Sequence, residues 1–220
     1  MGQKLGQLLR WIWLSALIVS TSACGTLFHS AKEIRGQVVD EETGKPLKGV
    51  IVVAQWQPYF PPIGEKGAVH SHETLTDSEG RYFIPAWGPK PVPVGAEMRS
   101  ADPALMFFKP GYEPLSRANR IDMIVKKTPP GVSEWDGKVM KMKPFRGTEE
   151  RYHDLLLTFT FGFHADEGEW RQFPRIVWAI ERENRRLKSA LGERMRLSVY
   201  IINMRTLKPE DLDYLKRFER

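Results

Sequence analysis

The sequence contains only one cysteine, Cys24, among its 220 residues. A single thiol can form no internal disulfide, so the stability of the folded chain must come from a hydrophobic core. The sequence also lacks a P-loop, a G-x-S-x-G motif and a G-x-G-x-x-G motif after a strand. These are the local patterns that most directly indicate phosphate, ester or dinucleotide chemistry. We therefore expect a protein that is not an enzyme and that needs no cofactor.

An uninterrupted run of one charge is also missing, although the formal net charge is +6. The excess of lysine and arginine lies in the C-terminal third, where basic residues alternate with acidic ones, as in residues 181–186. This alternation is typical of the solvated face of a helix. It argues against nucleic acid as a partner and leaves at most a weak attraction to anionic lipid headgroups.

The N-terminus has the three parts of a secretory leader. Lys4 and Arg10 give it a basic start, residues 11–19 are apolar, and small residues precede Cys24. In sequence this segment resembles a bacterial lipoprotein signal, in which cleavage occurs directly before a cysteine whose thiol carries a diacylglycerol. The resemblance implies a signal peptide over residues 1–23, lipidation of Cys24 and a tether over residues 24–32.

The lipoprotein interpretation implies a location. Residue 25 is glycine, not the aspartate that in many Gram-negative bacteria retains lipoproteins at the inner membrane. We therefore expect a protein anchored by lipid in the outer membrane, facing the periplasm or the cell surface. An ordinary cleaved signal and an uncleaved membrane anchor are the alternatives.

Residues 33–127 have the pattern of a β-sandwich. Short β-branched and aromatic runs at residues 34–39, 49–56, 72–76, 81–85, 105–109 and 120–125 are separated by turns rich in glycine and proline. Such punctuation predicts an antiparallel sandwich whose first four strands form two hairpins. In the second hairpin, Gly80 is expected to have positive φ and Asp77 to cap the turn.

Four segments carry a resemblance to a known family. They are IRGQVVD (34–40), TGKPLKGV (43–50), TDSEGRYFIP (76–85) and KPGY (109–112). Together they resemble the carboxypeptidase regulatory-like domain, a transthyretin-like β-sandwich, over about residues 33–126. The resemblance implies that fold, and it implies a non-catalytic module of the kind found beside enzymes or in bacterial surface proteins.

The C-terminal part changes to helical periodicity after a predicted linker over residues 128–147, so residues 148–220 are expected to form a helical extension. A helix is predicted to start after Thr148, another to run from Pro174 to Leu191, and a third to occupy residues 209–218. Ile180 and Leu187 should be buried, because the apolar face of the second helix is too wide to remain in water. Residues 197–202 could be strand or helix.

Aromatic residues give one candidate binding site. Trp56, Tyr59 and Trp87 lie in or beside two long loops, residues 57–71 and 85–103. Aromatic loops at one end of a sandwich could stack on a sugar or hold a peptide. The alternative for Trp56 is that it packs into the core.

Two histidines give a second candidate. His70 and His72 should share one face of a strand, and with the nearby Glu73 they could hold zinc or copper. The alternative is an exposed polar face. The interpretation favoured by the sequence is a lipid-anchored, non-catalytic binding or structural module of the bacterial envelope, whose partner is a membrane and an envelope protein or glycan. An envelope hydrolase with its site in the long loops and a periplasmic metal-binding protein are the alternatives.

Overall fold

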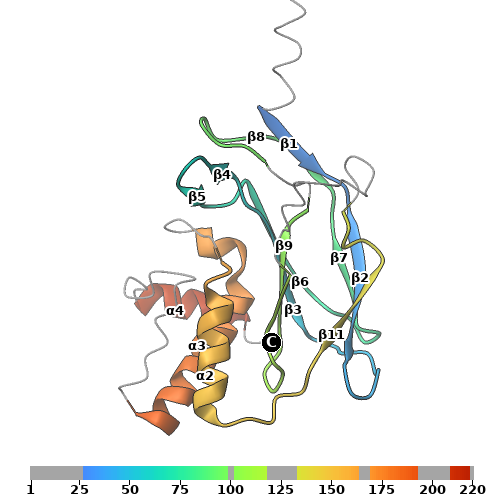
Figure 1. Ribbon diagram of the computed structural model, residues 1–220. Helices are drawn as coiled ribbons and strands as arrows, with labels where there is room; N and C mark the ends of the chain where they lie inside the picture. The colour runs from blue at the N-terminus through green and yellow to red at the C-terminus, as the bar shows by residue number, and fades with distance from the viewer. Residues whose placement is uncertain (1–26, 99–101, 118–132, 164–168, 193–208, 219–220) are drawn as a thin grey trace, which may run out of the picture.

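The computed structural model of the chain is a mixed α+β structure, with sandwich-like β-sheets followed by C-terminal helices (Figure 1). It describes residues 27–98, 102–117, 133–163, 169–192 and 209–218. The predicted lipidation site Cys24, the predicted strand at 120–125 and the undecided segment 197–202 lie outside these ranges.

Two main sheets form the β part. The first has the strand order β10 (Leu115–Arg117), β9 (Ala104–Phe108), β3 (Ile51–Trp56) and β6 (His70–Leu75). The second has the order β11 (Lys138–Met142), β2 (Ile34–Asp40) and β7 (Arg81–Ile84). Two small pairs lie at one end of the molecule, β1 (Phe28–Ala31) with β8 (Trp87–Pro91) and β4 (Tyr59–Phe60) with β5 (Gly64–Glu65).

The prediction of two hairpins is wrong. β2 pairs with β7, whereas β3 pairs with β6 and β9, so the turn after β2 and the turn after β6 both carry the chain from one sheet to the other. The local turn geometry was nevertheless predicted correctly. Gly80 has a φ of 70°, and Asp77 Oδ1 accepts hydrogen bonds from the backbone N–H groups of Glu79 and Arg81. A glycine turn reverses the chain, but it does not determine which strand becomes the partner.

The expected linker over residues 128–147 contains a strand of the sandwich. β11 adds to the three-stranded sheet beside β2, and the two strands are parallel rather than antiparallel. Met140 and Met142 point into the core while Val139 is exposed, which is the alternation of an edge strand with one buried face.

The C-terminal helices form as predicted. α2 (Glu149–Thr160) begins after its N-cap Thr148, whose hydroxyl accepts from the N–H of Arg151, and α3 spans Pro174–Leu191. The short helix η2 (Glu169–Gln172) precedes α3, and α4 (Pro209–Leu215) continues into η4 (Lys216–Phe218). Ile180 and Leu187 are fully buried, as the apolar stripe predicted.

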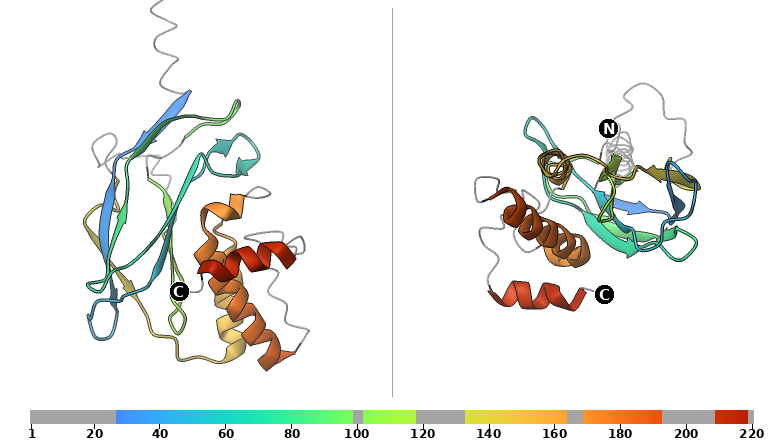
Figure 2. Two further views of the ribbon diagram at one scale, coloured as in Figure 1. Left: turned by 180° about the vertical axis from the view of Figure 1, so that it is seen from behind. Right: turned by 90° about the horizontal axis from the view of Figure 1, so that it is seen from below.

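The four-stranded sheet is the middle layer of the molecule. Val52, Ala54 and Trp56 of β3 pack toward the three-stranded sheet, whereas Ile51 and Val53 pack against α2 and α3. Figure 2 shows the helices on one side of this sheet. Burial of both faces explains why β3 and β9 are apolar at nearly every position instead of alternating.

The glycine at position 80 provides a test of this architecture. A Cβ on Gly80 would overlap the carbonyl oxygen of Val38, whereas Gly44 has a similar φ of 68° with open space around it. We expect Gly44→Ala to lower the free energy of unfolding by about 1 kcal/mol, the cost of left-handed backbone for alanine. Gly80→Ala should cost about 1–3 kcal/mol more, because overlap is added to backbone strain. If urea denaturation gave the same loss of unfolding free energy for both variants, the close approach of Gly80 to the backbone of Val38 would be contradicted.

Candidate functional site

An aromatic cluster joins four strands at the end of the sandwich where β1 and β8 pair. The ring of Trp87 in β8 lies 5.0 Å from Trp56 in β3, 4.7 Å from His70 in β6 and 5.5 Å from His29 in β1. Lys90 adds its ammonium group 5.7 Å from the Trp87 ring. The cluster therefore contains two of the three aromatic residues predicted as ligand contacts, together with one of the two histidines of the alternative metal site.

The three predicted ligand contacts have different exposures. Trp56 has no exposed surface, so it is part of the core and cannot touch a ligand in this conformation. Trp87 and Tyr59 are half-buried. Tyr59 is not part of the ring cluster. Its backbone exchanges two hydrogen bonds with the backbone of Glu97. The prediction of Trp56 as a contact was wrong because β3 is buried on both faces along its whole length.

His29 and Lys90 belong to the cluster although sequence reasoning did not single them out. The Nε2 atom of His29 and the Nε1 atom of Trp87 are buried without a hydrogen-bond partner among the described residues. Burial lowers the pKa of His29. The sequence could not indicate that these two residues join the cluster, because they are far apart along the chain. They come together where β1 pairs with β8 and His29 lies opposite Lys90.

His70 is held as a neutral imidazole. Lys90 Nζ lies 2.9 Å from His70 Nδ1, and because an ammonium group can only donate, Nδ1 accepts and the ring proton resides on Nε2. Burial, followed by the charges of Lys90 and His72, lowers the pKa of His70 to about 4. A neutral ring in this position suits packing against indole more than proton transfer near pH 7.

The contribution of Lys90 to this pKa can be measured. Lys90→Met removes the neighbouring positive charge but leaves the burial, so the pKa of His70 should rise from about 4 while staying below 6.5. An NMR pH titration of the imidazole C2 proton would report the change. Lys66→Met, at an exposed lysine directly after β5, is the control and should leave the value unchanged. An unaltered pKa in the Lys90 variant would contradict the contact.

The proposed metal set does not assemble around Glu73. His70 and His72 lie opposite Trp56 and Ala54 and so face the inside of the sandwich, whereas Glu73 lies opposite Val53 on the face covered by the helices. No group of three or more His, Cys, Asp or Glu residues in the described part of the chain is arranged to hold a metal ion. The alternation of a strand separates the carboxylate from the two imidazoles.

Glu73 instead caps a helix from another part of the chain. Its two carboxylate oxygens accept from the backbone N–H groups of Arg175 (3.0 Å) and Ile176 (2.9 Å), in the first turn of α3. The residue at the N-cap, Phe173, has no side-chain capping bond of its own. A carboxylate at a helix N-terminus satisfies unpaired donors and interacts favourably with the helix dipole. The sequence contains one indication of this arrangement. Phe173, directly before Pro174, has no side-chain acceptor, so the cap must be supplied by a residue distant in sequence.

This buried carboxylate makes stability depend on pH. The side chain is 2% exposed, and burial raises the pKa of Glu73 to about 7 despite the opposing hydrogen bonds from Ile176 and Arg175. Between the ordinary pKa near 4.5 and this value, the folded protein holds a proton that the unfolded chain has lost. The free energy of unfolding should therefore fall as pH rises from about 4.5 to 7, by at most about 3 kcal/mol.

Glu73→Gln should remove this part of the pH dependence, because the amide keeps an acceptor but does not titrate. Urea denaturation of both proteins from pH 5 to 8 tests the prediction. Glu79→Gln, at an exposed turn residue, is the matched control and should retain the slope of the parent. If the Glu73 variant kept the same slope, the titrating group would be another residue.

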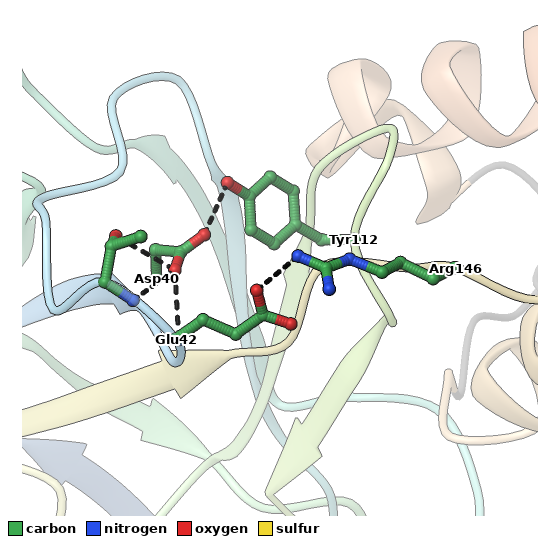
Figure 3. A network of polar contacts seen from close by, with 5 residues as sticks. Asp40, Glu42, Tyr112 and Arg146 are labelled. Atoms are coloured by element: carbon green, nitrogen blue, oxygen red, sulfur yellow. Dashed lines mark hydrogen bonds and ion pairs between the residues drawn. The ribbon is translucent and has the colours of Figure 1, made fainter.

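Motif residues of the family resemblance meet in a polar network (Figure 3), at the end of β2 that lies opposite to β1 and β8 (Figure 1). Asp40 Oδ1 accepts from the backbone N–H groups of Glu42 and Thr43, and Asp40 Oδ2 accepts from the hydroxyl of Tyr112 at 3.0 Å. These bonds, led by that from the Thr43 backbone, lower the pKa of Asp40. Arg146, just before α2, pairs with Glu42. The network holds the 40–46 turn, the 109–112 turn and the start of the helical part together.

A shallow depression of about 370 Å³ lies between the edges of β6 and β7. Its charged lining residues are already engaged. Arg35 pairs with Glu33, Arg81 pairs with Glu79, and Asp77 caps the turn. The depression is thus neither in the long loops nor supplied with an uncommitted carboxylate that could act as an acid or base.

Comparisons with known proteins identify no family. No family model matches the sequence, and the comparison with curated proteins gives no match. Solved structures give distant matches to β-sandwich proteins. A streptococcal ancillary pilin has a TM-score of 0.28 at 13% identity, covering 56% of this chain and 31% of its own. The 3-chlorocatechol 1,2-dioxygenase from Rhodococcus opacus 1CP has a TM-score of 0.33 at 19% identity, and the match covers 55% of this chain and 62% of the dioxygenase.

A third match is a 9R-lipoxygenase from Cyanothece PCC8801, with a TM-score of 0.29 at 13% identity, covering 73% of this chain and 24% of its own. The chain thus spans less than two thirds of each of these three structures. Similarity at this level carries no argument about the family or the activity of this chain. Within the described ranges, no helix combines the length and the apolar character needed to cross a bilayer.

Proposed function

We propose that this protein is a lipid-anchored, non-catalytic module of the bacterial cell envelope, built on a carboxypeptidase regulatory-like sandwich. The observation that carries the proposal is the leader that ends in small residues directly before the single cysteine. A lipid on this thiol accounts both for the leader and for the absence of a second cysteine. Outer-membrane residence follows from Gly25, and the expected partner besides the membrane is an envelope protein or glycan.

The roles of the motif residues support the assignment to this fold family. Gly36 lies opposite Tyr82, and a Cβ at Gly36 would overlap the tyrosine ring, so glycine and aromatic residue are required together. Asp40 and Tyr112 tie two turns to each other. These motif side chains hold the sandwich, and a set of motifs with purely structural roles is what a non-catalytic module needs.

The contacts of the polar side chains support a binding or structural role over an envelope hydrolase. Glu73 caps α3, Asp77 caps a turn, and His70 accepts from Lys90. Each of these side chains is thus engaged in a contact that stabilises the fold, Glu73 and Asp77 with backbone N–H groups and His70 with Lys90. Of the predicted ligand contacts, the half-buried Tyr59 and Trp87 retain some exposed surface, against which a sugar or peptide could pack.

Lipidation can be tested directly. In the full-length protein expressed in a Gram-negative host, the N-terminal peptide should begin at Cys24 and carry the mass of a diacylglycerol with an additional acyl chain. Cys24→Ser should lose this modification and move into the soluble fraction, because no acyl chain then holds the protein to the membrane. Ser30→Ala is the control and should remain lipidated. An unmodified Cys24 in the membrane fraction would refute the lipid anchor.

A further inference from the structure

Four exposed apolar side chains lie on segments that meet at one end of the molecule. Leu27 and Phe28 start the described chain and are 53% and 50% exposed, Ile63 on the β4–β5 turn is 78% exposed, and Val94 after β8 is 100% exposed. Figures 1 and 2 show the β1–β8 and β4–β5 pairs together at the end of the molecule where β1 begins. We propose that this end, defined by Leu27, Phe28, Ile63 and Val94, inserts into the surface of the lipid bilayer.

Hydrogen bonds make these segments a single surface. The N–H of Val92 donates to the carbonyl of Leu27 at 2.8 Å, which joins the start of the chain to the segment after β8. Tyr59 and Glu97 exchange two backbone hydrogen bonds of 2.9 Å, which join that same segment to the β4–β5 pair. The apolar tips are therefore held in fixed relation to one another rather than on independent loops.

The backbone of the tips is suited to an environment with little water. Prolines occupy positions 61, 62, 91 and 93 and have no N–H group that would need a partner. The N–H groups of Val92 and Ala96 are already bonded within the surface. Unsatisfied backbone donors are what prevents most loops from entering lipid, and here several of them are absent or paired.

Position along the chain indicates a bilayer as the occupant. Leu27 follows Cys24 by three residues, so a lipid on that cysteine would hold this end, and no other, against the membrane. Residues 64–66 and 90–97 contribute both signs of charge, Glu65 and Glu97 with Lys66 and Lys90. The interaction is therefore driven by burial of apolar surface, and it should persist on neutral lipid and at high salt. This inference rests on the proposed lipid anchor for its orientation.

Site-specific fluorescence on the full-length lipidated protein in phosphatidylcholine vesicles tests the proposal. An environment-sensitive NBD label is placed at single cysteines made by Ile63→Cys, Val94→Cys and Val139→Cys, while the acylated Cys24 cannot react. Val139 on β11 is the matched control, an apolar side chain that is 53% exposed on the flank of the sandwich. Labels at 63 and 94 should be blue-shifted and quenched several-fold more by doxyl lipids than the label at 139, with no change in 0.5 M salt.

Equal, weak quenching at all three positions would overturn the proposal. A blue shift at 63 and 94 without quenching by doxyl lipids would also overturn it, because it would mean that a second protein molecule covers the tips. The mass of the N-terminal peptide from the same preparation separates this result from the proposed function. If Cys24 carries no lipid, the proposed anchor is refuted. The quenching is then measured with the same labels in a Cys24→Ser background, and it decides whether the tips bind vesicles by themselves.

Discussion

The requirement that β3 and β9 bury both of their faces determines the rest of the structure. A sheet covered on one side only would leave Ile51, Val53, Met106 and Phe108 in water. Each side chain would then lose roughly 1.5–3 kcal/mol of the free energy gained by burial. α2 and α3 supply the cover, and the Glu73 carboxylate fixes α3 to the strand next to β3. The C-terminal helices are therefore part of the core and not an appendage joined to a finished sandwich.

Local features of the fold could be predicted from the sequence, whereas strand partners could not. Pro174 and Gly192 mark the ends of α3, and the turn at Gly80 has the backbone expected of it. These features depend on neighbouring residues. The partners of β2 and β6 depend on which faces become buried, and the parallel strand β11 requires a crossover that no short pattern encodes. For the same reason the sequence predicts Trp56 as a ligand contact and Glu73 beside the histidines, whereas Trp56 is buried in the core and Glu73 caps α3.

The two ends of the sandwich have different characters. At one end, Asp40, Tyr112 and Arg146 form a closed polar network that stabilises turns (Figure 3). At the other, the cluster of Trp87, His29 and His70 lies behind tips that expose Ile63 and Val94. Under the proposed lipid anchor at Cys24, the end with the exposed apolar tips would face the membrane and the end with the polar network would face away from it.

Native-state hydrogen exchange tests the central claim, that sandwich and helices share one core, most directly. If the middle sheet needs cover on both faces, the slowest amides of β3 and of α3 should exchange with the same free energy and the same dependence on denaturant, as parts of one cooperative unit. Exchange of α3 at a much lower free energy, with β3 still protected, would show that the sandwich is stable without the helices and would contradict the account.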